Sequence, residues 1–203
     1  YDLELREPVA QWLSLGGTGL NCAGGPTPWN SWITCEEWTQ RADQRHARDH
    51  GFAFEVPATL DRIPCMPKPL RAMGRFHREA VAVDPATGIV YQTEDRQDGA
   101  FYRFIPDRPG DLAAGGRLQA LAIRGVSRFD TRNWRHDTHD RIRTGEQLPV
   151  EWIDMDDPES PRDDLRYRAY EAGAARFARG EGIWTGVGVM HFACTTGGVM
   201  QNG

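Results

Sequence analysis

Three short segments of this chain carry carboxylate or thiol side chains at the ends of strand-forming runs. In each segment, two apolar runs flank a tight turn, which is the pattern of a β-hairpin. The turns lie at 26–28, 84–88 and 185–188. Because the two open ends of a hairpin lie beside each other, each segment should present a polar pair at one edge of a sheet. These pairs, each 14 or 15 residues apart, are Cys22 with Glu36, Glu79 with Glu94, and Glu181 with Thr195.

If the hairpin ends converge, their side chains would form a site for multivalent cations. Carboxylates in close company raise one another's pKa and destabilise a fold unless cations neutralise them. Hard carboxylate oxygens suit calcium or ferric iron, and a thiolate adds affinity for iron. Each acid taken alone is more simply a solvated residue at a strand end. The set that we expect to converge comprises Cys22, Glu36, Glu37, Glu79, Glu94, Asp95 and Glu181.

Two arginines and one histidine lie next to these candidate ligands. Arg96 follows Asp95, and Arg179 precedes Glu181 by two residues. A guanidinium holds two phosphate oxygens in a fork, so either arginine is a candidate clamp for a phosphoryl group; the alternative is an ion pair with the neighbouring acid. His77, two residues before Glu79, is a candidate metal ligand or general acid, or else a structural hydrogen-bonding residue.

The composition excludes several classes of protein. Of the 203 residues 39% are hydrophobic and 26% charged, which is typical of a globular protein. The net charge of −5 argues against a nucleic-acid partner. No apolar run reaches the roughly 18 residues of a membrane helix, and no signal peptide is visible at the start of the chain. The chain contains no CxxC pair, nucleophile-elbow serine motif or phosphate-binding glycine loop.

The turn-rich pattern predicts an all-β fold with minor helical insertions. Repeated hairpins with converging ends favour a partial β-propeller of about three blades, with a β-sandwich as the alternative. Residues 100–105 should add a third strand to the second hairpin. We expect an insertion over 124–178 that contains a helix near 161–178, and a second helix over 36–50. Cys35 should be a buried strand residue, and its pairing with Cys65 is left open.

Four ordered blocks resemble the PhoX-type bacterial alkaline phosphatases. Arg78 stands where that family's pattern has a histidine before the glutamate of the second block. The blocks are 21–37, then 74–76 with 79–85, then 91–96 with 101–104, and finally 179–184.

This resemblance implies a single six-bladed propeller domain, of which we expect the chain to be a fragment lacking the C-terminal blades. It implies hydrolysis of small phosphomonoesters with ferric iron and calcium as cofactors, and twin-arginine export to the periplasm or beyond. By position, Cys22 is the iron thiolate and Arg179 contacts the phosphate. The resemblance implies carboxylate ligands from Glu36 or Glu37, Glu79 and Glu181, with Glu94, Asp95, Arg96 and His77 as additional candidates.

Two other functions remain alternatives to a metal-dependent phosphatase. One is a calcium-dependent propeller lactonase or esterase, whose site uses one metal and no thiolate. The other is a non-catalytic propeller scaffold that metal ions stabilise. We expect no nucleic-acid or membrane partner, and we expect a monomer.

Overall fold

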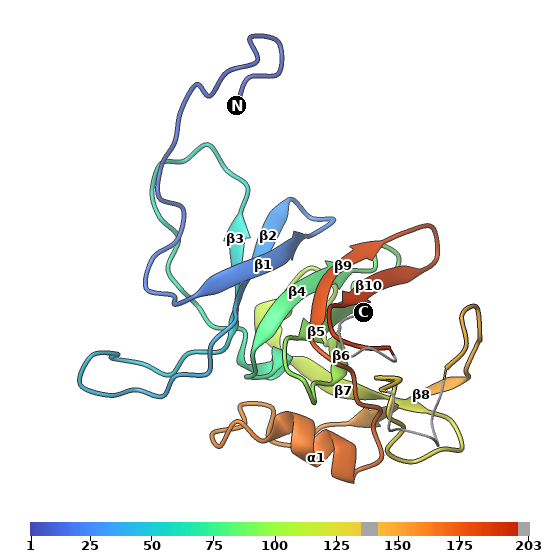
Figure 1. The fold of residues 1–203 in the computed structure, drawn as a ribbon. Helices are drawn as coiled ribbons and strands as arrows, with labels where there is room; N and C mark the ends of the chain where they lie inside the picture. The colour runs from blue at the N-terminus through green and yellow to red at the C-terminus, as the bar shows by residue number, and fades with distance from the viewer. Residues whose placement is uncertain (135–141, 199–203) are drawn as a thin grey trace.

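Antiparallel hairpins form at all three predicted segments. The computed structural model describes residues 1–134 and 142–198 (Figure 1). The first hairpin pairs β1 (Asn21–Pro26) with β2 (Ser31–Glu36), the second β4 (Arg78–Val83) with β5 (Val90–Glu94), and the third β9 (Gly180–Thr185) with β10 (Met190–Cys194). Local turn chemistry explains the second hairpin, where the Asp84 carboxylate accepts hydrogen bonds from Ala86 N and the Thr87 hydroxyl.

Additional strands extend the first two hairpins into sheets. The first sheet has the order β1-β2-β3, with β3 at Ala53–Pro57. The second has the order β4-β5-β6-β7-β8, and its remaining strands are β6 (Phe101–Pro106), β7 (Gly116–Ile123) and β8 (Val150–Asp154). Short 3-10 helices lie at Arg71–Met73 and Leu112–Ala114. The predicted all-β class and the strand expected at 100–105 are therefore confirmed.

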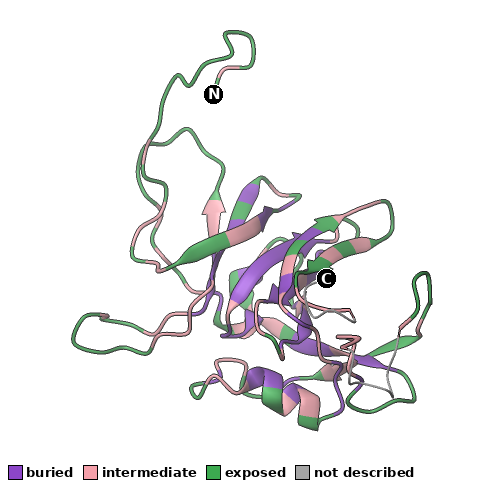
Figure 2. Ribbon diagram, viewed as in Figure 1, coloured by how far each residue is buried: buried purple, intermediate pink, exposed green. Residues whose placement is uncertain are grey.

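The innermost strand β4 lies between the other two hairpins. It packs against β1 on one side and β9 on the other, and all six of its residues are buried (Figure 2). Its apolar side chains contribute to two of the core clusters, with Val81 and Val83 in one and Ala80 and Ala82 in the other. The three sheets do not close into a barrel; they are arranged as in part of a β-propeller, as predicted.

The contact between β1 and β4 depends on a glycine. A Cβ atom added at Gly25 would lie 2.0 Å from the Val81 carbonyl oxygen, which is rigid backbone. We expect Gly25→Ala to lower the free energy of unfolding by at least about 3 kcal/mol, because the two strands would have to separate. Urea unfolding is the measurement. Gly182→Ala is the matched control because its added Cβ meets nothing within 4 Å; equal losses in the two variants would contradict this explanation.

The predicted helix over 161–178 is much shorter in the structure. The helix α1 covers Leu165–Glu171, with Asp164 rather than Ser160 at its N-cap, and it lies below the five-stranded sheet in Figure 1. The chain leaves the helix at Gly173, where φ is +110°. It then runs beside β7 and the start of β6, where Ala175 N donates to Leu121 O and Phe177 N donates to Gly99 O. The segment expected as an insertion also supplies β8, and its residues 135–141 lie outside the described part.

The helix expected over 36–50 does not form; Glu36 ends β2 and the described residues after it make a loop. The Asp43 carboxylate accepts hydrogen bonds from Arg45 N and His46 N, and the Asp49 carboxylate accepts one from Ala42 N. These side chains satisfy backbone donors that a helix would otherwise use, which is the known competition of aspartate with helical hydrogen bonding.

Residues 1–20 form an extended arm that projects from the sheets beside the segment 58–68 (Figure 1). Cys65 N donates to Ser14 O, and Leu15 forms an isolated bridge with Cys65. Among the described helices, none has the length and apolar character needed to cross a membrane.

Candidate metal centre

The first strand of each of the three predicted hairpins carries the same β-bulge. In β1–β2 the pairing passes from Asn21–Glu36 to Gly24–Thr34, so three steps along one strand oppose two along the other. The same irregularity occurs in β4 between Arg78 and Val81, and in β9 between Gly180 and Ile183. A bulge turns the extra residue away from the regular face of its strand. The residues at this equivalent position are Cys22, Glu79 and Glu181.

A second repeated feature fixes the residue that follows each hairpin's second strand. The backbone N–H of this residue donates to the carbonyl of the residue immediately before the first strand of the same hairpin, over 3.0–3.1 Å. The three bonds are Glu37 to Leu20, Asp95 to His77 and Thr195 to Arg179. Each hairpin therefore presents two side chains, one from its bulge and one from just beyond its second strand. The pairs are Cys22 with Glu37, Glu79 with Asp95, and Glu181 with Thr195.

Three of these side chains meet closely enough to hold one metal ion. The Cys22 thiol donates to Glu79 Oε1 over 3.1 Å. One potential ligand atom each from Cys22, Glu37 and Glu79 lies within 4.8 Å of the others. These donors come from two different hairpins, and Cys22 and Glu79 are 57 residues apart in the chain. The ends of the first two hairpins therefore meet, as their polar residues led us to expect, and they bring Cys22, Glu37 and Glu79 together.

The charges of the group oppose ionisation of its members. Partial burial, the hydrogen bond to Glu79 and the charges of Glu79 and Glu37 raise the pKa of the Cys22 thiol to about 12. Burial raises the pKa of Glu79, and the nearby Glu181 and Asp95 charges act in the same direction. Without a cation the group therefore retains protons that a metal ion would displace.

Glu37 and Asp95 share a hydrogen bond and have opposite pKa shifts. Burial, this hydrogen bond and the Glu79 charge raise the pKa of Glu37 to about 7. Burial also acts on Asp95, but hydrogen bonds from Arg179 outweigh it and lower the pKa of Asp95. The shared proton therefore belongs to Glu37, which donates it to the ionised Asp95.

Arg179 is held rigidly at the edge of this group. Its Nε and Nη2 donate to the two Asp95 carboxylate oxygens over 2.8 and 2.9 Å, and Nη2 also reaches Glu181 Oε1 at 3.1 Å. Its backbone has a φ of +53°, a conformation that costs a non-glycine residue energy. Within the described residues, Nη1 makes no hydrogen bond. Glu181 also accepts from the Thr195 hydroxyl over 3.0 Å.

Glu36 and Glu94 occupy equivalent positions at the ends of β2 and β5, and both are completely buried away from the group. Glu36 accepts hydrogen bonds from His50 and from the backbone N–H groups of Gly19, Gly51 and Phe52. Glu94 Oε2 accepts from Ala100 N and the Tyr102 hydroxyl. The structure therefore brings Glu37 and Asp95 to the site, while these two neighbours hold the surrounding backbone.

The buried Glu94 predicts a pH-dependent stability. Burial raises its pKa to about 7, although the Arg166 charge and two hydrogen bonds oppose the shift. An unfolded glutamate titrates at about 4.3, so between these two pKa values the folded state retains a proton that the unfolded chain releases. The free energy of unfolding should therefore fall as pH rises from about 4.5 to about 7, by on the order of 3 kcal/mol from this group.

We expect Glu94→Gln to remove this component of the pH dependence, because the amide does not titrate. Urea unfolding at several pH values between 5 and 8 measures it. The exposed Glu151→Gln is the control and should keep the wild-type profile. An unchanged slope in Glu94→Gln would mean that Glu94 is ionised throughout this range.

The side chains of His77 and Arg96 contact each other rather than the metal-ligand candidates. Arg96 Nη2 donates to His77 Nε2, and Arg96 also lies 3.6 Å from Asp163. Burial and the Arg96 charge lower the pKa of His77. Arg78, at the place of the family's histidine, is fully buried and donates to Gln92 and to the Met73 and Gly74 carbonyls. It supports the backbone behind Glu79.

The sequence indicated only weakly that Thr195 belongs to the site. Its position marked the polar end of the third hairpin, but its hydrogen bond to Glu181 could be found only from the fold. The four cysteines are free, so Cys35 and Cys65 are not joined, and Cys35 is buried in β2 as expected.

The donor set fits iron and calcium. It combines one thiol with carboxylates, and burial together with their mutual repulsion raises the pKa of Cys22, Glu37 and Glu79. Carboxylates bind both hard cations, while the thiol favours a softer ion than calcium. The fold and this site define a β-propeller protein with a candidate metal centre.

Comparisons with known proteins identify the family. The family described as "Alkaline phosphatase PhoX" matches residues 2–202, so the chain belongs to the PhoX alkaline phosphatase family. None of the curated proteins matches it. A similar solved structure is that of Pseudomonas fluorescens PhoX in complex with vanadate, a transition state analogue, with a TM-score of 0.52 and 19% identity. The match covers 82% of this chain and 37% of that one, so this chain spans little more than a third of its length.

Proposed function

We propose that this protein contributes to a metal-dependent phosphomonoester hydrolase of the PhoX type. The observation that carries the proposal is the meeting of Cys22, Glu37 and Glu79 within 4.8 Å, with the Arg179 guanidinium beside them. Membership of the PhoX family and the structural likeness to a vanadate complex support the same chemistry.

Ferric iron and calcium are the proposed cofactors. Cys22 would supply a thiolate to iron, and Glu37 and Glu79 would supply carboxylate oxygens, with Asp95 and Glu181 available at the edge of the group. When bound, such cations supply neutralisation of the phosphoryl charge and activation of water for attack at phosphorus. The protein's own contribution is to hold the ligands together, while Arg179 offsets part of the charge of Asp95 and Glu181.

Arg179 is proposed to orient the substrate. Asp95 fixes the guanidinium plane through two hydrogen bonds, which leaves Nη1 for an oxygen of the phosphoryl group. Because the side chain is already positioned, binding a phosphate costs it little conformational entropy. No serine nucleophile is required by this arrangement.

Hydrolysis of p-nitrophenyl phosphate by the protein loaded with iron and calcium tests the proposal. We expect activity in the loaded protein, loss after exhaustive chelation, and recovery after both metals are returned. Activity that survives chelation would exclude the proposed role of the metal ions. Absence of iron from a loaded protein that binds calcium would favour a lactonase or a scaffold instead.

The remaining proposals follow from family membership. The substrates would be small phosphomonoesters, and the protein would act as a monomer in the periplasm or outside the cell after twin-arginine export.

A further inference from the structure

A single buried hydroxyl lies between the bulges of β4 and β9. Thr93, in β5, stands opposite both Glu79 and Ala80, because the β4 bulge places two residues against one. Thr93 is 1% exposed, so its hydroxyl needs partners within the protein. The residues opposite the bulges of the first and third hairpins are Cys35 and Ala193. Among the three hairpins, therefore, only the second carries a hydroxyl at this position.

This hydroxyl bonds to the backbone of both bulges. It donates to Glu181 O over 2.6 Å and accepts from Ala80 N over 3.1 Å. Ala80 O, at 3.4 Å, is a more distant acceptor for the single hydroxyl proton. Ala80 directly follows Glu79, and Glu181 is itself the bulge residue of β9. One side chain therefore links the backbone beside one candidate ligand to the backbone of another.

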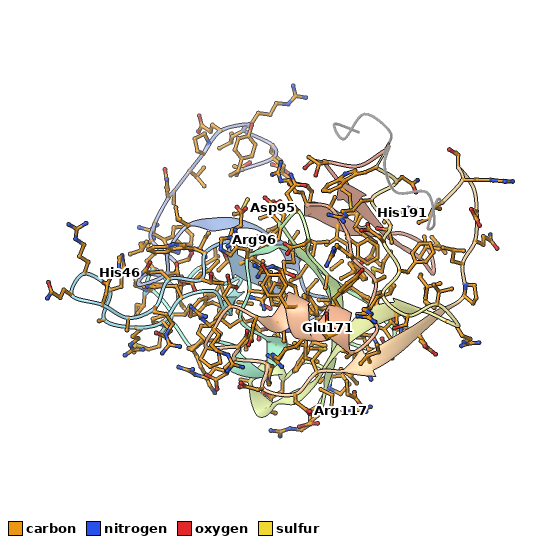
Figure 3. All side chains as sticks on the ribbon, turned by 60° about the horizontal axis from the view of Figure 1, so that its bottom comes forward. His46, Asp95, Arg96, Arg117, Glu171 and His191 are labelled. Atoms are coloured by element: carbon orange, nitrogen blue, oxygen red, sulfur yellow. The ribbon has the colours of Figure 1, made fainter. Side chains whose placement is uncertain are left out.

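The start of β9 is held at this point by two further contacts. A Cβ atom added at Gly180 would lie 3.3 Å from Thr93 Cβ, so β9 packs closely on this residue. Arg179 N donates to Arg96 O over 2.8 Å. Arg96 lies beside Asp95 on the loop after β5 (Figure 3). The end of β5 thus supports β9 through the Thr93 hydroxyl, a close contact and a backbone hydrogen bond.

The separation of Glu79 and Glu181 matters because both side chains are negative when ionised. The Glu181 charge is one of the causes that raise the pKa of Glu79. Such carboxylates repel each other in the absence of a cation, and a cation needs their oxygens at distances that vary by only about 0.2 Å. Holding the backbone of both residues in advance therefore lowers the cost of bringing the two side chains to a cation.

We propose that Thr93 is a positioning residue for the candidate metal centre: its hydroxyl sets the separation of Glu79 and Glu181 by holding the two bulges together. This inference rests on the proposed metal-dependent function, because the separation acts through cation binding. Of the two proposed cations, calcium should depend on it more, since both positioned ligands offer only oxygens. Without the hydroxyl, Ala80 N and Glu181 O would lose a buried partner, and β9 would be free to shift away from β4.

Calorimetric titration of the metal-free full chain with calcium chloride tests the proposal. Thr93→Val keeps the approximate size of the side chain without its hydroxyl, and Thr93→Ser keeps the hydroxyl. The control is Thr27→Val. Thr27 is also buried and its hydroxyl accepts from Ser31 N over 3.0 Å, but it lies in the turn between β1 and β2, at the opposite end of that hairpin from Cys22. Urea unfolding measures the stability of each variant.

We expect Thr93→Val to raise the calcium dissociation constant by about 10- to 100-fold, the cost of removing a residue that supports a metal ligand. Thr93→Ser and Thr27→Val should bind calcium as the wild-type protein does. Unchanged affinity in Thr93→Val, with or without a loss of stability, would overturn the proposal. So would an equal loss of affinity in Thr93→Ser or in Thr27→Val, or a wild-type protein that binds no calcium.

Hydrolysis of p-nitrophenyl phosphate separates this result from the proposed function. A wild-type protein that binds calcium with an affinity dependent on the Thr93 hydroxyl, but that does not hydrolyse the ester when loaded with both metals, would contradict the phosphatase function and leave the positioning role in place.

Discussion

Replacing Cys22 with serine should reduce the bound iron to background and lower the hydrolysis of p-nitrophenyl phosphate at least about hundredfold. Loss of a residue that only supports a metal ligand already costs 10- to 100-fold in affinity or activity, so loss of a direct ligand should cost more. Serine preserves the size of the side chain but replaces a soft sulfur with a hard oxygen. Metal content by elemental analysis and initial rates are the measurements.

The raised pKa of this thiol adds a pH dependence to metal binding. Because the Cys22 pKa is about 12 without a cation, iron must displace the thiol proton when it binds. The apparent iron affinity should therefore increase with pH in the wild-type protein. Calorimetric titration of the wild-type protein with iron in buffers of different ionisation enthalpy detects this proton release.

Cys65→Ser is the matched control for Cys22→Ser. Cys65 lies on the segment beside the N-terminal arm, and its substitution should change neither iron content nor hydrolysis. Full activity of Cys22→Ser with calcium alone would contradict the phosphatase proposal and favour a calcium-dependent lactonase or esterase. Iron-free wild-type protein that lacks hydrolysis would favour a scaffold.

Replacing Arg179 with alanine should lower kcat/KM for p-nitrophenyl phosphate by about 10²- to 10³-fold, the range observed when one oriented donor to a developing charge is removed. The change removes the proposed phosphoryl contact and both hydrogen bonds that lower the Asp95 pKa. Lysine should recover little activity, because an ammonium cannot reproduce the fork that engages Asp95. Separate values of kcat and KM show whether the lost contact acts in binding or in the reaction.

The control for Arg179 is Arg128→Ala, an exposed arginine whose carboxylate partner, Glu171, lies outside the site. Its substitution should leave kcat/KM unchanged. If Arg179→Ala also retained wild-type kcat/KM, the residue would be a structural partner of Asp95 and not a substrate contact.

The local sequence determined the hairpins. Proline, glycine and aspartate turns between apolar runs fix a hairpin through nearby contacts, so β1–β2, β4–β5 and β9–β10 appear where the pattern predicts them. Local patterns were less informative for helices. Asp43 and Asp49 bind backbone donors of the expected 36–50 helix. The helix expected near 161–178 is shortened because the chain turns at Gly173 and then bonds to Leu121 and Gly99.

The sequence by itself also determined which residue types meet: a thiol, several carboxylates and an arginine at hairpin ends. Only the tertiary structure decided which of two adjacent acids lies at the site. Successive side chains of a strand face opposite sides, so Glu36 and Glu37, or Glu94 and Asp95, separate according to register and where each strand ends. The bulges at Cys22, Glu79 and Glu181, and the packing of β4 against β1 and β9, set that geometry through contacts between residues far apart in the chain.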